Sequence, residues 1–254
     1  TSLNFNTIIV EGGDDDDTLD ITQLTSEHRV VFNSGGGDNA IIGQPRAQDV
    51  INQAQSDTFT RTGTSGNDVL HGSAWGEIVD GKEGNDQLYG KDGHDNLIGG
   101  SGRDRLQGDA GNDTAAGGEG NDWVIAGAGN DTMNGGADID TFYAGHIASR
   151  VNVQLGNGRA SGVDIGTDWI SNVENAITGQ GDDIIVGDNL SNLFIAGAGN
   201  DRVNGVGGAD RIEGGAGNDD LTGGTGTDRF VFAAGFGNDV IRDADGKILS
   251  EQFV

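Results

Sequence analysis

The sequence predicts an all-β protein that winds as a right-handed parallel β-roll, in which two repeat arrays are joined by a β-rich insertion. Nine consecutive nine-residue units of the pattern G-G-x-G-x-D-x-U-x run from residue 63 to residue 143, and six more run from 178 to 231. The eighth position, U, is apolar in all fifteen units. Because strand side chains alternate between faces, each unit turns this side chain inward, and two units complete a coil of eighteen residues.

Five segments follow from this pattern, in chain order: a degenerate β-rich N-terminal region at 1–62, the first array at 63–143, the insertion at 144–177, the second array at 178–231, and a C-terminal cap and tail at 232–254. Residues 11–20 and 34–43 each run from a Gly/Asp loop into a short apolar strand. We therefore expect the N-terminal region to be a degenerate relative of the same coil.

The insertion and the C-terminal cap lack the nonapeptide. In the insertion, turn clusters at GNG and SG separate residues with strand-like alternation, namely Val151, Val153 and Leu155. This pattern predicts strands that carry the apolar core across the register break. Beyond the second array, we expect Phe232, Phe236 and Ile241 to cover the last coil.

The loop half of the unit carries the chemistry. Glycine at the first, second and fourth positions permits positive φ and lets successive carbonyl oxygens turn into one loop, while aspartate at the sixth position adds a carboxylate. Calcium takes about six to eight oxygen ligands, which one such loop cannot supply. The pattern therefore predicts Ca²⁺ ions that are each shared by two loops eighteen residues apart.

Pairing aspartates eighteen positions apart predicts about nine Ca²⁺ ions or more. The expected carboxylate ligands are Asp68, Asp86, Asp95, Asp104, Asp113, Asp122, Asp131, Asp140, Asp183, Asp201, Asp210, Asp219, Asp228 and, after the second array, Asp239. The fourth-position glycines expected to curl around the ions are Gly66, Gly84, Gly93, Gly102, Gly111, Gly120, Gly129, Gly181, Gly199, Gly208, Gly217 and Gly226. Glu77 and Asn192 replace aspartate in loops that also lack this glycine, so their pairs are weaker candidates.

The repeated unit is identified as a member of the RTX (repeats-in-toxin, haemolysin-type calcium-binding) family. The resemblance implies a module of a larger protein that leaves the cell through the type I secretion apparatus and folds on calcium outside it. Residues 24–51 also resemble segments that link animal-type haem peroxidase regions to RTX repeats. The tail EQFV either resembles the uncleaved end of a type I substrate or is an ordinary terminus.

Two acidic groups outside the arrays leave alternatives open. The insertion resembles the segment between RTX arrays that ends in G-x-D-x-[LI]-x-x-[IV]-E-N, and Asp168 and Glu174 occupy its acidic positions. They either bind a further calcium ion or are solvated or helix-capping. The four acids at 14–17 either hold one calcium ion or form a solvated charge run.

The composition supports a calcium-dependent fold. Acidic residues number 41 against 14 basic ones, giving a net charge of −27, so there are too few basic side chains to offset the repulsion between stacked acids. Cysteine is absent, so no disulfide can hold the chain together against that repulsion. We therefore expect the metal-free chain to be largely unfolded, with calcium supplying the folding free energy. The negative charge argues against nucleic acid and anionic lipid as partners, and no apolar run is long enough for membrane insertion.

The repeat predicts no enzyme. Acid and base catalysis needs carboxylates in differing environments, whereas these occupy equivalent repeat positions, and the four histidines show no metal-ligand spacing. The alternative function is an extracellular adhesion or carbohydrate-binding roll, with a cell surface or a carbohydrate as its partner. Tryptophans at 75, 123 and 169 are candidates for sugar contact, but they do not share a repeat position.

Overall fold

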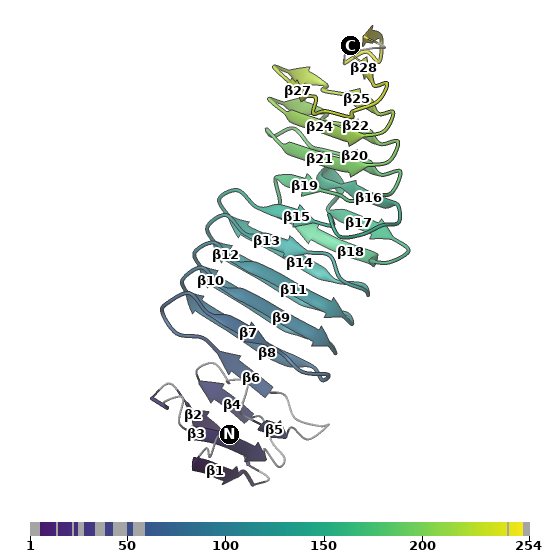
Figure 1. The fold of residues 1–254 in the computed structure, drawn as a ribbon. Helices are drawn as coiled ribbons and strands as arrows, with labels where there is room; N and C mark the ends of the chain where they lie inside the picture. Colours follow the sequence, from purple (N-terminus) through teal and green to yellow (C-terminus); the bar gives the residue numbers. More distant parts are fainter. Residues whose placement is uncertain are drawn as a thin grey trace.

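The computed structural model describes residues 6–13, 15–21, 23–24, 28–33, 39–42, 50–52, 59–242 and 244–250. Within these residues the fold is all-β, apart from the short 3-10 turn η1 (Leu155–Asn157). The chain climbs as a coil from the N-terminus at one end to the C-terminus at the other, with parallel strands stacked on two faces (Figure 1). The prediction of a parallel β-roll is confirmed.

Two sheets form the faces of the roll. The fifteen-stranded sheet has the spatial order β2 (Thr18–Asp20), β4 (Asn39–Ile42), β6 (Phe59–Thr62), β8 (Glu77–Glu83), β10 (Asn96–Ser101), β12 (Thr114–Glu119), β14 (Thr132–Ala137), β18 (Gly166–Ser171), β17 (Arg159–Gly162), β16 (Val151–Gln154), β20 (Ile184–Val186), β22 (Arg202–Asn204), β25 (Asp220–Thr222), β28 (Val240–Arg242) and β29 (Ile248–Ser250). The nine-stranded sheet has the order β27 (Arg229–Val231), β24 (Arg211–Ala216), β21 (Leu193–Ala198), β19 (Asn175–Ile177), β15 (Thr141–Tyr143), β13 (Trp123–Ile125), β11 (Arg105–Ala110), β9 (Gln87–Asp92) and β7 (Val69–His71). Two small sheets contain β1 (Asn6–Glu11), β3 (His28–Asn33) and β5 (Val50–Asn52), and β23 (Gly207–Gly208) with β26 (Thr225–Gly226).

Strands in the arrays stack in the eighteen-residue register that the sequence predicts. Leu97 of β10 pairs with Val79 of β8 on one side and with Ala115 of β12 on the other. The inward apolar residues therefore form columns, and fourteen of the fifteen are buried. Phe230, in the last unit, is half-buried. Because burying one large apolar side chain contributes about 1.5–3 kcal/mol, these columns are the main apolar contribution to stability.

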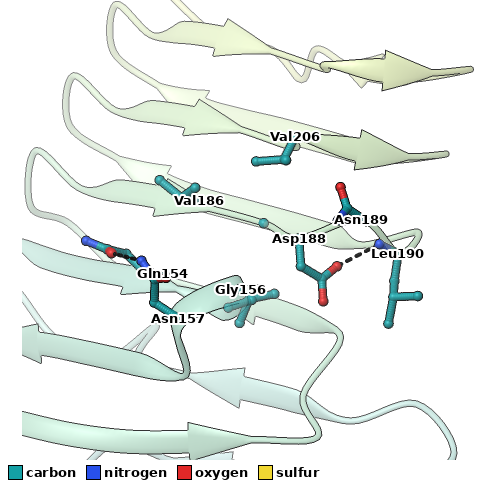
Figure 2. A pocket seen from close by; sticks show the side chains of 10 residues that line it. Gln154, Gly156, Asn157, Val186, Asp188, Asn189, Leu190 and Val206 are labelled. Atoms are coloured by element: carbon teal, nitrogen blue, oxygen red, sulfur yellow. Dashed lines mark hydrogen bonds between the residues drawn. The ribbon is translucent and has the colours of Figure 1, made fainter.

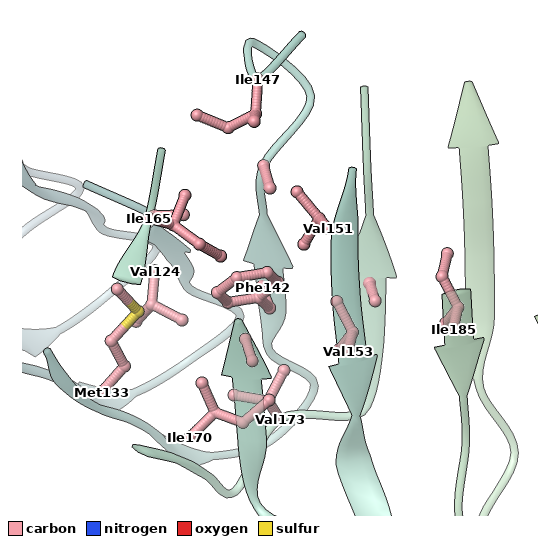
Figure 3. Packing of buried hydrophobic residues seen from close by; sticks show 14 of the residues in the cluster. Val124, Met133, Phe142, Ile147, Val151, Val153, Ile165, Ile170, Val173 and Ile185 are labelled. Atoms are coloured by element: carbon pink, nitrogen blue, oxygen red, sulfur yellow. The ribbon is translucent and has the colours of Figure 1, made fainter. Parts of the chain in front are cut away.

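The insertion keeps the two arrays in one continuous roll. In the nine-stranded sheet, β19 pairs in parallel with β15 of the first array and β21 of the second. In the fifteen-stranded sheet, β18 pairs in parallel with β14, β16 pairs in parallel with β20, and β17 lies antiparallel between β16 and β18. Insertion residues such as Val151, Ile165 and Ile170 pack in one cluster with Phe142 and Ile185 of the flanking arrays (Figure 3).

The N-terminal region continues the fifteen-stranded sheet through β2, β4 and β6. Its apolar core is separate from that of the arrays and contains Ile21, Val30, Phe32, Ile41 and Phe59. Arg61 occupies the inward position that pairs with Ile41 on one side and Val79 on the other, and it is 6% exposed. A charged side chain therefore interrupts the apolar column at this point.

The C-terminal cap closes the other end. Ile241 is buried, Phe232 packs against the core, and the rings of Phe232 and Phe236 meet edge to face with their centroids 5.3 Å apart. The loop at 34–38 and the tail at 251–254 lie outside the described residues. No helix in the described part of the chain has the length and apolar character needed to cross a membrane.

Candidate metal sites

Two columns of acidic residues run along the roll, one beside each sheet. Each acid stands two positions before an inward apolar residue, so its side chain faces inward as well. The backbone N–H of Asp86 donates to Oδ1 of Asp104 at 2.8 Å, and that of Asp104 donates to Oδ1 of Asp122 at 2.8 Å. In the other column, Asp95 donates to Asp113 in the same way at 2.8 Å. The stacking of carboxylates eighteen residues apart is therefore present in the fold.

The second oxygen of most column aspartates is buried without a partner. Eleven Oδ2 atoms have no hydrogen-bond donor among the described residues, and they belong to Asp86, Asp95, Asp104, Asp113, Asp122, Asp140, Asp168, Asp183, Asp201, Asp210 and Asp219. An unpaired buried carboxylate oxygen costs free energy unless a charge compensates it. The repetition of this feature along both columns indicates sites for cations.

Glycine at the first position of the unit leaves space beside the free oxygen. A Cβ built at Gly117 would lie 2.3 Å from Oδ2 of Asp122 and 2.3 Å from the carbonyl oxygen of Gly135 in the next coil. A carboxylate oxygen and a carbonyl oxygen therefore converge on a point that no side chain fills. Hard oxygen donors of this kind are the ligands that Ca²⁺ prefers, so the residues fit this ion.

Fourth-position glycines allow the coils to approach each other. Ten of the twelve adopt positive φ, and at Gly111 (φ 141) a Cβ would lie 1.4 Å from the carbonyl oxygen of Gly93. Gly66 and Gly181, which open the two arrays, do not adopt positive φ. The residues described contain no group of three or more Asp, Glu, His or Cys side chains around one point. Each site therefore depends on carboxylate pairs completed by backbone oxygens.

Burial changes the proton affinity of the columns. It raises the pKa of Asp95, Asp122 and Asp201 to about 7. At Asp122 the hydrogen bond from the Asp104 backbone opposes this rise, whereas the charges of Asp104 and Asp140 add to it. Without a metal ion, these carboxylates therefore hold protons more tightly than exposed aspartates do.

The first acid of each column is satisfied by its own loop. Oδ2 of Asp68 accepts hydrogen bonds from the backbone N–H of Thr64 at 2.6 Å and from its hydroxyl at 2.9 Å. Glu77 likewise accepts from the Ser73 backbone at 2.9 Å and from the Ser73 hydroxyl. Thr64 and Ser73 place a hydroxyl where the repeat has its second glycine, and this hydroxyl is the sequence signal that distinguishes these two end loops.

Both columns continue through the insertion. The backbone N–H of Asp131 donates to Oδ1 of Asp168 at 3.0 Å, and that of Asp140 donates to Oε2 of Glu174 at 2.8 Å. The sequence left these two acids open between calcium binding and a solvated or helix-capping role, and the structure places both in line with the columns. Beyond the second array, Asp239 accepts from the Asp219 backbone at 3.0 Å.

One of the acids at 14–17, Asp17, makes hydrogen bonds like those of the acid columns. Asp14 lies outside the described residues. Oδ2 of Asp17 accepts from the Gly13 backbone at 2.8 Å, and the Asp17 backbone donates to Oδ1 of Asn39 at 3.0 Å. An amide thus takes the column position next to Asp17.

A second ladder, at the fifth position of the unit, was not anticipated from the sequence. The backbone N–H of Asn130 donates to Oδ1 of Asn112 at 2.8 Å, and Asn112 donates in turn to Nδ1 of His94 at 2.8 Å. His94 is exposed, and its imidazole links two neighbouring loops. The frequent asparagine at this position is the signal that could have predicted the ladder.

Glycine-lined coils with buried acid columns define this molecule as a cation-binding parallel β-roll. The family model described as the RTX calcium-binding nonapeptide repeat matches the chain in four copies, at residues 62–74, 76–106, 107–142 and 195–230. The chain thus carries RTX repeats, which bind Ca²⁺. Comparison with curated proteins finds no match.

Two surface hollows lie beside the columns. One, of about 470 Å³, lies between η1 and the loop after β20, and its single carboxylate, Asp188, accepts from the Leu190 backbone at 2.8 Å (Figure 2). The other, of about 490 Å³, lies on the outer face of the nine-stranded sheet, where Trp123 forms part of the lining. The ring of Trp123 stacks on Tyr143 with centroids 5.0 Å apart.

Proposed function

We propose that this chain is a calcium-dependent folding module that binds about nine Ca²⁺ ions or more between successive coils. The observation that carries the proposal is the set of buried, unpartnered Oδ2 atoms along both columns. Aspartates eighteen residues apart would hold each ion, together with backbone oxygens of the glycine loops. When bound, Ca²⁺ supplies the positive charge that these carboxylates lack.

The balance of charge explains why folding would require the ion. The roll gathers acidic side chains into columns within a chain of net charge −27. Removing carboxylates from water without compensation is costly, and each inward apolar residue offsets only about 1.5–3 kcal/mol. Calcium that binds the folded roll and not the unfolded chain shifts the equilibrium toward the roll by mass action.

Export from the cell would explain why folding depends on calcium. The RTX repeats support a module of a larger, secreted protein that passes the type I apparatus while unfolded and folds where calcium is abundant. Folding would propagate from coil to coil, because each coil contacts mainly its neighbours. The acids occupy equivalent positions in the columns, which supports a structural role for them rather than catalysis.

The test is circular dichroism of the purified full chain. We expect a coil-like spectrum in chelator and a β-rich spectrum after calcium is added. Magnesium prefers near-octahedral geometry and gives up water reluctantly, so we expect magnesium alone to leave the β signal undeveloped. A cooperative, well-folded chain in chelator, or full recovery with magnesium, would contradict the proposal.

A second candidate function is carbohydrate binding at the hollow beside Trp123. Its lining combines this aromatic ring with the hydrogen-bonding side chains of Asn85, Gln87, Arg105 and Asn121. An indole face packs against apolar C–H groups, while amides and guanidinium groups bond hydroxyls. This combination supports a sugar as ligand and gives the alternative function a specific location.

Binding of the calcium-loaded chain to immobilised saccharides tests this second candidate. We expect Trp123→Ala to abolish retention. Trp75→Ala removes an exposed tryptophan that is not part of the hollow, so this control should retain binding. Failure of the unmodified chain to bind any saccharide, or equal binding by both variants, would reject the hollow as a sugar site.

A further inference from the structure

The insertion provides acids that continue both columns of the first array. Asp168 follows Asp131 by 37 positions and Glu174 follows Asp140 by 34, yet each accepts the backbone hydrogen bond that a residue eighteen positions later accepts within the arrays. Both lie between the repeat matches that end at 142 and resume at 195. No matched repeat therefore includes them.

The chain around Asp168 reproduces the second half of a nonapeptide. Residues 166–170 read Gly-Thr-Asp-Trp-Ile, and Trp169 pairs with Thr132 of the preceding coil. The Trp169 backbone donates to the Asp131 carbonyl at 2.8 Å, the same bond that Thr132 makes to Asp113 at 2.8 Å. Gly166 adopts φ 68, and a Cβ there would lie 1.9 Å from the Gly129 carbonyl oxygen. The insertion thus contributes a loop like those of the repeats, although it does not lie at the eighteen-residue spacing of the arrays.

One carboxylate oxygen of Asp168 lacks a hydrogen-bond donor among the described residues. Its side chain is 0% exposed, and its Oδ1 accepts from the Asp131 backbone at 3.0 Å. Its Oδ2 is buried and receives no hydrogen bond from any described residue. A solvated role is therefore excluded for this carboxylate, and a helix-capping role is excluded because Gly166–Ser171 is a strand.

In the other column, carboxylate and carbonyl oxygens also converge on a point beside a glycine, at Gly135. A Cβ at Gly135 would lie 2.5 Å from the free Oδ2 of Asp140 and 2.0 Å from the carbonyl oxygen of Asn172. Asn172 adopts φ 49, and its amide donates to Oδ1 of Asn134 at 2.8 Å. The Asn172 carbonyl thus takes the place that a next-coil glycine carbonyl holds in the array.

The opposite edge of the insertion is joined by neutral groups. The backbone N–H of Val151 donates to Oδ1 of Asp183 at 2.7 Å, so no second carboxylate stacks on Asp183 from this side. The side-chain amide of Asn192 donates to the Glu174 carbonyl at 2.7 Å. Acid pairs therefore face the first array, and hydrogen bonds from neutral donors face the second.

We infer that a further Ca²⁺ ion binds between Asp131 and Asp168 and another between Asp140 and Glu174, and that these ions clip the first array to the insertion. The inference rests on the proposed function, because it applies the shared-site rule outside the repeats. The insertion and the second array then behave as one unit, and calcium at the junction joins the first array to it.

The test uses the full chain with Asp168→Asn, Glu174→Gln and the double variant. Amides keep the hydrogen-bonding shape while removing charge, and Asn192 shows that a column tolerates an amide. Asp164→Asn is the matched control, since Asp164 is an exposed acid in the same segment. Bound calcium is counted after equilibrium at saturating calcium, and thermal unfolding is followed by calorimetry.

We expect each single variant to bind one ion fewer than the unmodified chain and the control to lose none. In the double variant, the calcium-loaded unfolding transition should split in two as the first array separates from the rest. Unchanged ion counts in both single variants, while the unmodified chain binds its array ions, would overturn the inference alone. An unmodified chain that binds no calcium would instead reject the proposed function.

Discussion

The backbone N–H of Asp104 donates to Oδ1 of Asp122, eighteen residues further along the chain, at an N···O distance of 2.8 Å. The Oδ2 of the same Asp122 carboxylate is buried and receives no hydrogen bond from the described residues. Asp122 therefore holds the preceding coil with one carboxylate oxygen and leaves the other oxygen for a cation. Positioning and ligation are combined in a single side chain, which makes the columns sensitive to substitution.

Substitution of Asp104 tests whether ligands are shared between coils. Asp104 has column neighbours on both sides, so Asp104→Ala should weaken the sites shared with Asp86 and with Asp122. Leaving buried partners incomplete costs about 1–3 kcal/mol, which corresponds to a roughly 5- to 150-fold loss of affinity at each affected site, so the calcium midpoint should rise. Glu77→Ala should have a smaller effect, because Ser73 already satisfies Glu77. Equal midpoints in calcium titrations of the two variants would argue against sharing.

Filling the space beside a free carboxylate oxygen should displace an ion, because the added methyl group would occupy the point on which the oxygen ligands converge. Gly117 does not have positive φ, but a methyl group there would meet Oδ2 of Asp122 and the carbonyl oxygen of Gly135, each at 2.3 Å. We expect Gly117→Ala to bind fewer ions, as counted at saturating calcium. Gly156→Ala is the control, since the nearest atom to its Cβ is 3.3 Å away. Full ion binding by Gly117→Ala would show that the point beside Gly117 is not an ion site.

The metal-free roll should gain stability as pH falls. The pKa of Asp122 is raised from 3.8 to about 7 by burial, so the folded state binds the proton more tightly than the unfolded chain does. This contribution is fully present below the unfolded pKa and is lost as pH rises through about 7. In chelator and high salt, we expect more β signal at about pH 5.5 than at pH 8. Asp122→Asn should reduce the difference, and a β signal that rises with pH would contradict the assignment.

The same linkage makes calcium compete with protons. Acidification through about pH 7 should raise the calcium midpoint for folding, because protons must leave the column carboxylates before Ca²⁺ binds. Titrations at fixed salt would measure the midpoint at each pH. A midpoint independent of pH in this window would show that the column carboxylates are not the ligands.

Replacing Arg61 should stabilise the calcium-loaded protein. The side chain is 6% exposed, its Nε has no hydrogen-bond partner among the described residues, and burial lowers its pKa against the opposing charges of Glu77 and Asp95. A buried charge costs free energy unless it is paired and hydrogen-bonded, so removing this charge should lower that cost. We expect Arg61→Met to raise the unfolding temperature in saturating calcium. A lower temperature would show that Arg61 compensates Glu77 and Asp95 even in the presence of calcium.

Much of the site could be predicted because the repeat is local. The pairing of Asp104 with Asp122 follows from the nine-residue period, since two units complete one coil and side chains alternate along each strand. The nine-residue period does not predict that Oδ2 of Asp68, unlike that of most column aspartates, is hydrogen-bonded. Its Oδ2 is taken by Thr64, and only the loop geometry shows that the hydroxyl and the carboxylate meet.

The sequence by itself determined the coil, the inward apolar columns and the oxygen chemistry of the loops, because each depends on residues close in the chain and repeated at a constant spacing. Only the tertiary structure decided that Asp168 stacks on Asp131 and Glu174 on Asp140. Those contacts depend on the antiparallel strands β16, β17 and β18, which return the chain to the sheet across 37 and 34 residues. No period encodes that return, because it is set by non-local packing against both arrays.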